Sequence, residues 1–227
     1  MASDQLEQIR RSLSILKMKT IADILDDELA RAAQESTPVT ELLERLLTQE
    51  IDALIQRRIE RSIKQSKLPE SKLLADFDFA FQKGLDKARI MEIAGLDFVE
   101  RKQGLILAGN SGTGKSHIAK AILLIGCMKT YSCLYTTAAD MLRELLASLA
   151  DDTLEKKLKR YLAPDILLID EVGFDRLEQQ DAYNANLFHK VIDGRYCKKT
   201  TMLTTNIDFK QLGDYLGDPV ITTAIVD

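Results

Sequence analysis

The run of residues with the clearest chemical potential is the glycine-rich segment GNSGTGKS, which fits the pattern G-x-x-x-x-G-K-[ST]. It follows a short apolar run and precedes a helix-like segment. Glycines let the backbone wrap closely around an anion, so that successive N–H groups and the positive end of the next helix point at a phosphate. The lysine adds a positive charge, and the serine hydroxyl suits the Mg²⁺ that accompanies a nucleoside triphosphate. The residues predicted to bind ATP are Gly109, Asn110, Ser111, Gly112, Thr113, Gly114, Lys115 and Ser116.

Two adjacent acids, Asp170 and Glu171, form the second candidate site. They follow the apolar residues 166–169, as expected at the carboxyl end of a buried strand. Beside a phosphate-binding loop, Asp170 is expected to complete the Mg²⁺ shell opposite Ser116, while Glu171 orients or deprotonates the attacking water. The alternative interpretation is that both acids merely end a strand and begin a loop.

A polar amide, Asn206, ends the next apolar run in the same way. Its side chain is expected to hydrogen-bond the γ-phosphate or the lytic water and so to sense the nucleotide. The alternative is a loop asparagine that caps the following turn. The predicted catalytic residues are therefore Lys115, Asp170, Glu171 and Asn206, with Ser116 and Asp170 as the Mg²⁺ ligands.

Residues 104–227 alternate between strand and helix patterns. Short apolar runs lie at 105–108, 133–136, 166–169 and 202–205, and helical patterns lie at 138–149, 153–162 and 181–192. This alternation is typical of βαβ units with right-handed crossovers. It predicts an α/β fold of the P-loop NTPase type, with a mostly parallel sheet and flanking helices.

The first 67 residues are helical by their hydrophobic period. Apolar residues recur at steps of three and four in two short stripes and in a long one from Val39 to Ile63, with Thr37 as its N-cap and Pro38 at the first helical position. A small all-α domain is expected. The predicted organisation is an N-terminal helical domain over 1–67, a linker and entry to the core over 68–103, and an ATPase core over 104–227.

The end of the long helix carries a basic cluster. Arg57, Arg61 and Lys64 share one helix face by their spacing, and Arg58 adjoins them in sequence. From charge alone, a face that contacts nucleic-acid phosphates and an ordinary solvated face are equally good interpretations.

Composition limits the remaining alternatives. The net charge of −4 argues against a protein that coats nucleic acid over its whole surface. No run approaches 18 apolar residues and the N-terminus is charged, so neither a membrane span nor a signal peptide is predicted, and a cytoplasmic protein is expected. The cysteines Cys127, Cys133 and Cys197 have no C-x-x-C spacing and are expected to be small buried apolar residues.

The chain resembles the IstB family of transposition helper ATPases in four segments: GNSGTGKS, ILLIDEVGF, TTN and LTQEIDALIQRRIERSIKQSKLPESKLLADFDF. These are AAA+ proteins related to the DnaC helicase loader and, more distantly, to the replication initiator DnaA. The resemblance covers nearly the whole chain. Many ATPases share the first two motifs, whereas the E-x-x-x-x-x-x-R-R-I-x-R helix joined to L-P-x-x-K-x-L-x-x-F-D-F is more particular to IstB-like proteins.

The resemblance implies a sheet of order 5-1-4-3-2, ATP bound between neighbouring subunits and a helical N-terminal domain that helps to grip DNA. It also implies ATP-driven self-assembly on duplex DNA, as an oligomer or filament, which recruits and stimulates a partner transposase. It favours phosphate contacts by Arg57, Arg58, Arg61 and Lys64, with little base specificity.

The C-terminal end departs from the family pattern. IstB-like chains continue beyond the segment DYLGDPVITTAIVD into an arginine-bearing helix and a fifth strand beside the P-loop strand, whereas this chain stops at Asp227. We therefore expect a truncated chain whose sheet lacks its last strand and whose ATP turnover is impaired. Arg195 is a candidate substitute for the missing arginine, and a surface arginine is the alternative.

The predicted function is that of a DNA-stimulated ATPase, dependent on ATP and Mg²⁺, that assists a transposase in insertion-sequence transposition. Two alternatives stay open. One is a DnaC-like helicase loader, whose N-terminal helices bind a replicative helicase rather than duplex DNA. The other is a non-catalytic remnant that only binds nucleotide or partners.

Overall fold

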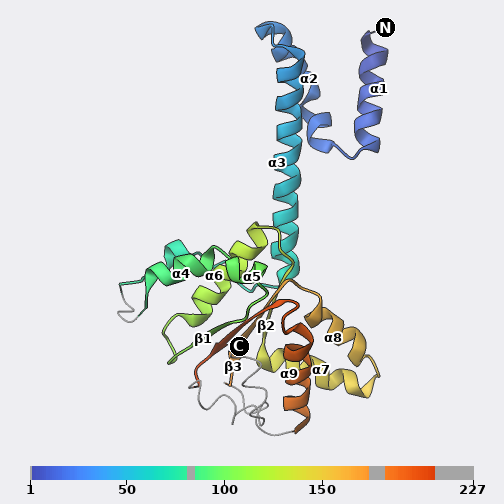
Figure 1. Ribbon diagram of the computed structural model, residues 1–227. Helices are drawn as coiled ribbons and strands as arrows, with labels where there is room; N and C mark the ends of the chain where they lie inside the picture. Colours follow the sequence, from blue (N-terminus) through green and yellow to red (C-terminus); the bar gives the residue numbers. More distant parts are fainter. Residues whose placement is uncertain (1, 81–84, 174–181, 208–227) are drawn as a thin grey trace. The chain divides into compact units, whose positions relative to one another are not determined.

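A computed structural model describes residues 2–80, 85–173 and 182–207 of the protein. The chain divides into two compact units, residues 1–60 and 61–227 (Figure 1). The division falls within the long helix α3, Val39–Ser66. The domain boundary at residue 67 stays a prediction.

The first unit consists of α1 (Ala2–Ile15), α2 (Lys19–Glu35) and the first part of α3. Its small apolar core gathers Leu13, Ile21, Leu25 and Leu46. Helix α3 begins one residue later than predicted, because the N–H of Thr37 closes α2 by bonding the carbonyl of Ala32 at 3.0 Å. The carbonyl of Pro38 then accepts the first hydrogen bond of α3, so Pro38 takes the N-cap position.

The second unit is an α/β structure, as predicted. Its helices are the end of α3, the 3-10 turn η1 (Leu74–Asp76), α4 (Lys87–Ala94), α5 (Asp97–Glu100), α6 (Lys115–Met128), α7 (Ala138–Ala150), α8 (Leu154–Leu162) and α9 (Ala182–Arg195). Its strands are β1 (Leu105–Ala108), β2 (Cys133–Thr137), β3 (Ile166–Val172) and β4 (Thr200–Thr205). Helices α4 and α5 lie in the segment predicted as a linker, where eight and four residues are too few to show a clear helical period.

The four described strands form a parallel sheet in the order β1-β4-β3-β2. This agrees with the expected order 5-1-4-3-2 for strands one to four. The expectation of a missing last strand concerns the chain after Ile207, which lies outside the described residues.

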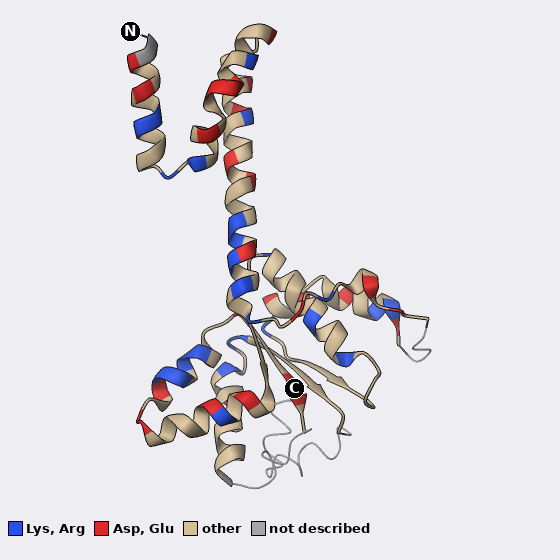
Figure 2. Cartoon of the chain, turned by 180° about the vertical axis from the view of Figure 1, so that it is seen from behind, with Lys and Arg blue, Asp and Glu red and all other residues tan. Residues whose placement is uncertain are grey.

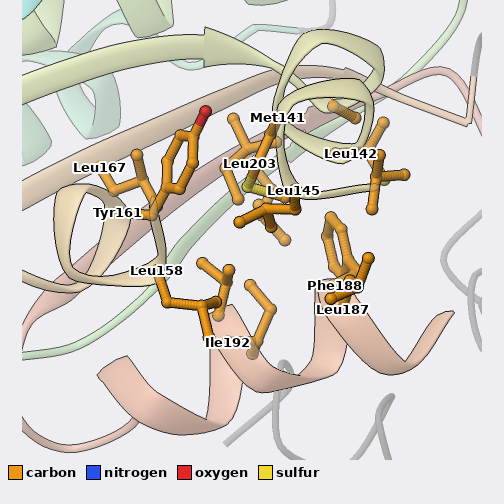
Figure 3. Packing of buried hydrophobic residues seen from close by; sticks show 14 of the residues in the cluster. Met141, Leu142, Leu145, Leu158, Tyr161, Leu167, Leu187, Phe188, Ile192 and Leu203 are labelled. Atoms are coloured by element: carbon orange, nitrogen blue, oxygen red, sulfur yellow. The ribbon is translucent and has the colours of Figure 1, made fainter. Parts of the chain in front are cut away.

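Helices cover both faces of this sheet. Helices α4, α5 and α6 supply the apolar cluster on one face, which receives Ile166 and Leu168 of β3. Helices α7, α8 and α9 cover the other face, which receives Ile169 and also Leu167, labelled in Figure 3. Alternate residues of β3 thus enter two different cores, which explains its uninterrupted apolar sequence.

Arg195 has no place in a neighbouring subunit's site, and the suggestion that it could substitute for a missing arginine was wrong. Its side chain is fully buried, and its guanidinium donates to the carbonyls of Tyr161 at 2.8 Å, Pro164 at 2.9 Å and Thr200 at 2.5 Å. Burial lowers the pKa of Arg195 to about 10. The residue joins the end of α8 to the starts of β3 and β4, so it is a structural anchor and not a surface arginine either.

The prediction that the cysteines are buried is confirmed for two of the three. Cys127 and Cys133 are buried, as expected, but Cys197 is exposed in the turn that follows α9, so the expectation for it was wrong. Among the residues that the structure describes, no helix has the length and apolar character needed to cross a membrane.

Candidate nucleotide site

Most of the predicted site residues line a cavity of about 320 Å³ in the second unit, but Gly109, Asn110, Thr113 and Asp170 are not among its lining residues. It lies where the loop between β1 and α6 meets the carboxyl ends of β3 and β4, the edge of a parallel sheet at which α/β proteins bind ligands. The lining residues are Ser111, Gly112, Gly114, Lys115, Ser116, His117, Glu171, Thr204, Thr205 and Asn206.

The glycine-rich loop has the backbone that its sequence predicts. Gly112 and Gly114 have φ angles of 77° and 85°, in a region that favours glycine. Helix α6 then begins at Lys115, so its first N–H groups are left to bind an anion. The Lys115 ammonium donates to the carbonyl of Asn110 at 2.7 Å, and burial lowers the pKa of Lys115 although the charge of Asp170 opposes this.

Asp170 is the most buried ionisable group of the site, with 1% of its surface exposed. Its Oδ1 accepts hydrogen bonds from Ser116 Oγ at 2.7 Å and from Thr204 Oγ1, while its Oδ2 accepts one from the Tyr135 hydroxyl at 3.2 Å. Burial, and secondly the charge of Asp170, raises the pKa of Tyr135. The structure thus brings the two predicted Mg²⁺ ligands into direct contact.

Sequence reasoning missed Tyr135 and Thr204 as partners of Asp170. Tyr135 lies two residues after Cys133, and Thr204 two after Met202, both of which pack in the cluster on the α6 side of the sheet. A period of two places all three polar groups on that face. The sequence shows this period of two, but it identifies Tyr135 and Thr204 as partners of Asp170 only when the order of the strands is known.

Glu171 reaches the cavity through a bulge in β3. The β3–β4 register shifts between Ile169 and Val172, and Glu171 takes a left-handed φ of 62° while its N–H donates to Thr204 Oγ1 at 2.9 Å. Strict alternation would send Glu171 to the α7–α9 side with Ile169, but Val172 takes that buried place. Glu171 is therefore exposed at the cavity, whereas its neighbour Asp170 is buried.

Asn206 also lines the cavity, directly after β4, and is exposed. The turn at this point is held by Thr205, whose hydroxyl donates to the carbonyl of Val172 at 2.8 Å and accepts from the N–H of Ile207 at 3.1 Å. This arrangement leaves Asn206 at the cavity wall.

The segment after α3 contributes to the site, although sequence reasoning treated it as a linker. A Cβ on Gly114 would lie 2.3 Å from Cε2 of Phe77, so the Phe77 ring packs directly against the phosphate-binding loop. The ring of His117 contacts the same phenylalanine edge-on, at 5.3 Å between centroids, and its Nε2 lies 2.9 Å from the carbonyl oxygen of Leu73. Nothing in the sequence indicates these contacts.

The donor set fits a Mg²⁺ ion that arrives with a nucleotide. Within the described ranges, no group of three or more His, Cys, Asp or Glu side chains could hold a metal. Ser116 Oγ and Asp170 Oδ1 nevertheless offer two hard oxygen atoms 2.7 Å apart beside the cavity. Mg²⁺ commonly takes one or two protein ligands and completes its shell with water and phosphate.

Figure 2 shows Lys and Arg gathered near the end of α3, and the four residues of the basic cluster differ in their contacts. Arg57 donates to the buried Glu50 at 2.7 Å and to the carbonyl of Ala53 at 3.1 Å. Arg58, Arg61 and Lys64 are exposed to solvent.

Comparisons with known proteins agree with this geometry. A family model described as IstB-like ATP binding protein matches residues 11–227. The chain is 34% identical over 221 residues to the predicted ATP-binding protein of insertion sequence IS232 from Bacillus thuringiensis subsp. berliner, covering 97% of this chain and 87% of the relative. It is 33% identical over 222 residues to the corresponding protein of insertion sequence IS21 from Pseudomonas aeruginosa, covering 98% and 83%.

Solved structures show the same fold. The crystal structure of the DnaC helicase loader matches with a TM-score of 0.57 and 21% identity over 70% of this chain and 93% of that one. The AMPPCP-bound DnaA from Aquifex aeolicus matches with a TM-score of 0.57 and 19% identity over 68% of this chain and 47% of that one. At these identities the likeness concerns the fold, an AAA+ type P-loop domain.

Proposed function

We propose that this chain, which belongs to the IstB-like ATP-binding protein family, is a DNA-stimulated ATPase that assists a partner transposase in insertion-sequence transposition. It is an ATP-binding protein of the insertion-sequence type, and its P-loop domain has the AAA+ fold. One observation carries the ATPase part of the proposal: the phosphate-binding loop, Asp170, Glu171 and Asn206 all meet at one cavity or its wall.

Nucleotide binding follows from the loop and the start of α6. The backbone N–H groups of residues 111–116 and the Lys115 ammonium would bind the phosphates, because these residues, apart from Thr113, line the cavity. Lys115 must leave the carbonyl of Asn110 to do so, which is a small movement of a flexible side chain. Ser116 and Asp170 would hold Mg²⁺, which would neutralise negative charge that develops on the phosphates.

Hydrolysis requires a carboxylate that is accessible to water, whereas the carboxylate proposed to bind the metal is buried. Glu171 is exposed at the cavity, unlike the buried Asp170, so its carboxylate would orient and deprotonate a water molecule. The Asn206 amide, on the adjacent strand end, would position that water or the terminal phosphate.

DNA binding is assigned to the exposed part of the basic cluster. Arg58, Arg61 and Lys64 would contact phosphates, while Arg57 mainly neutralises the buried Glu50. Contacts of this kind give little base specificity. Self-assembly on DNA and the transposase as partner are proposed from the family and from the insertion sequences to which its relatives belong.

An ATPase assay with and without duplex DNA tests the catalytic part. We expect DNA to raise turnover, Lys115→Ala to lose nucleotide binding, and Glu171→Gln to bind ATP without turning it over. Nucleotide binding with no hydrolysis under any DNA condition would favour a non-catalytic binding protein.

The DNA part is tested by salt dependence. Three phosphate contacts predict a loss of affinity of roughly 40-fold between about 50 and 200 mM salt. The double variant Arg58→Glu with Arg61→Glu should weaken binding and reduce this dependence, whereas Lys156→Glu, at an exposed position of α8, should not. Unchanged binding by the double variant would remove the DNA role from α3.

A further inference from the structure

A lysine outside the predicted site lies beside its buried carboxylate. Lys120 is on α6, one turn after Ser116, and its side chain is 14% exposed. Its ammonium lies 3.7 Å from Oδ2 of Asp170 and 3.7 Å from Oε1 of Glu70. It also lies 5.3 Å from the centroid of the Tyr135 ring, which adds a favourable cation–π contact.

The two oxygen atoms of Asp170 have different surroundings. Oδ1 accepts hydrogen bonds from the hydroxyls of Ser116 and Thr204, and Ser116 is the other predicted Mg²⁺ ligand. Oδ2 accepts a hydrogen bond from the Tyr135 hydroxyl and lies 3.7 Å from the Lys120 ammonium. The carboxylate proposed for metal binding therefore already has a cation on its far side.

Glu70 extends this arrangement toward α3. It lies four residues after the end of that helix, and its carboxylate also pairs with Lys72 at 3.1 Å. The Lys120 ammonium is thus shared between the nucleotide site and the segment that leads from α3 into the core.

We propose that Lys120 is a positioning residue that balances the charge of Asp170 when Mg²⁺ is absent and shifts toward Glu70 when Mg²⁺ is present. The proposal rests on the proposed nucleotide site. Two cations near one carboxylate repel each other, so Lys120 weakens the preference for Mg²⁺-bound over Mg²⁺-free nucleotide. It also contributes positive charge that attracts Mg²⁺-free phosphates. Both effects make nucleotide binding less dependent on Mg²⁺.

The measurable quantity is the ratio of two dissociation constants for a fluorescent N-methylanthraniloyl ATP, one in EDTA and one in excess Mg²⁺. Lys120→Met removes the charge and keeps an unbranched apolar stem beside Tyr135. We expect the ratio to rise by about tenfold, within the usual range for coupling between two binding events. Lys120→Arg should keep the wild-type ratio. Glu70→Gln should lower the ratio, because Lys120 then interacts with Asp170 alone.

Three controls separate the outcomes. Lys190→Met, at an exposed position of α9, should leave the ratio unchanged. Lys115→Ala should abolish binding in both conditions. A wild-type chain that is folded but binds no nucleotide would refute the proposed function. If the wild-type chain binds nucleotide, the ratios of the Lys120 and Glu70 variants test the role of Lys120.

The proposal is overturned if Lys120→Met folds and has the wild-type ratio, because loss of a merely structural lysine would change the melting temperature without changing the ratio. If Lys120→Met does not fold, Glu70→Gln decides the question: a lowered ratio supports the shared ammonium, and an unchanged ratio overturns it.

Discussion

Replacement of the buried Arg195 by methionine should destabilise the second unit strongly. Methionine fills much of the same volume but offers no donors, so the carbonyls that the guanidinium now satisfies would lose their partner. Five main-chain carbonyls accept from Arg195, those of Tyr161, Leu162, Pro164, Asp165 and Thr200. The hydroxyl of Thr201 accepts a further bond at 2.9 Å.

The magnitude follows from burial and from the number of bonds. A hydrogen bond from a charged donor contributes about 1.5–3 kcal/mol, and each buried acceptor left without a partner costs about 1–3 kcal/mol. These contributions do not add, because removal of a buried charge also removes its desolvation penalty. At the low end of that range the five unsatisfied carbonyls together cost about 5 kcal/mol, and the recovered desolvation penalty brings the expected loss to about 3–5 kcal/mol. For a chain of this size, that lowers the melting temperature by roughly 6–20 °C.

Urea unfolding and calorimetry would measure the loss, with Arg143→Met as the control. Arg143 forms an exposed pair with Asp140, so its loss should change the free energy of unfolding by less than about 1 kcal/mol. A change below about 1 kcal/mol for Arg195→Met would refute the anchor role. Loss of ATP turnover in a variant as stable as the wild type would return Arg195 to the list of catalytic candidates.

Three further predictions concern the site and its support. Glu171→Gln should retain ATP binding and reduce turnover by about 10²-fold or more, measured by equilibrium binding and steady-state hydrolysis. Gly114→Ala should abolish nucleotide binding, because φ is 85° and the new methyl would lie 2.3 Å from the Phe77 ring; adding Phe77→Ala should restore only the part lost to the clash. Burial alone would raise the pKa of Glu144, but hydrogen bonds and charges from α8 lower it to about 2. Its contribution to stability should be complete above pH 4.5, the ordinary value, and should disappear toward pH 2; Glu144→Gln should lose that acid-dependent part in pH-resolved unfolding curves.

The sequence predicted those parts of the fold that depend on local periodicity. The apolar runs and helical stripes located all four described strands and the helices from α6 onward, because a buried parallel strand and an amphipathic helix have distinct patterns. Arg195 shows the limit of this reasoning. An arginine after a helix is normally exposed, and only the convergence of α8, β3 and β4 supplies enough carbonyls to bury it.

The candidate site likewise combines residues that the sequence predicts with residues that it does not predict. Ser116 and Asp170 belong to motifs with a fixed relation to strand ends, so their contact could be expected from the sequence. Phe77 and Lys120 belong to no such motif. Their places depend on how the segment after α3 lies against α6, which is a matter of tertiary packing.

Thr204 shows how one hydroxyl can keep two adjacent acids in different surroundings. Its Oγ1 donates to Asp170 Oδ1 and accepts from the N–H of Glu171 at 2.9 Å, so it satisfies the buried carboxylate and holds the bulge in place at the same time. Without the bulge, the alternation of β3 would direct Glu171 into the apolar cluster now occupied by Val172, where an ionised carboxylate would have no partner. The different surroundings of Asp170 and Glu171 therefore depend on a hydroxyl that the neighbouring strand supplies at this position. The cost of the left-handed φ at Glu171 is offset by that hydrogen bond and by the burial of Val172.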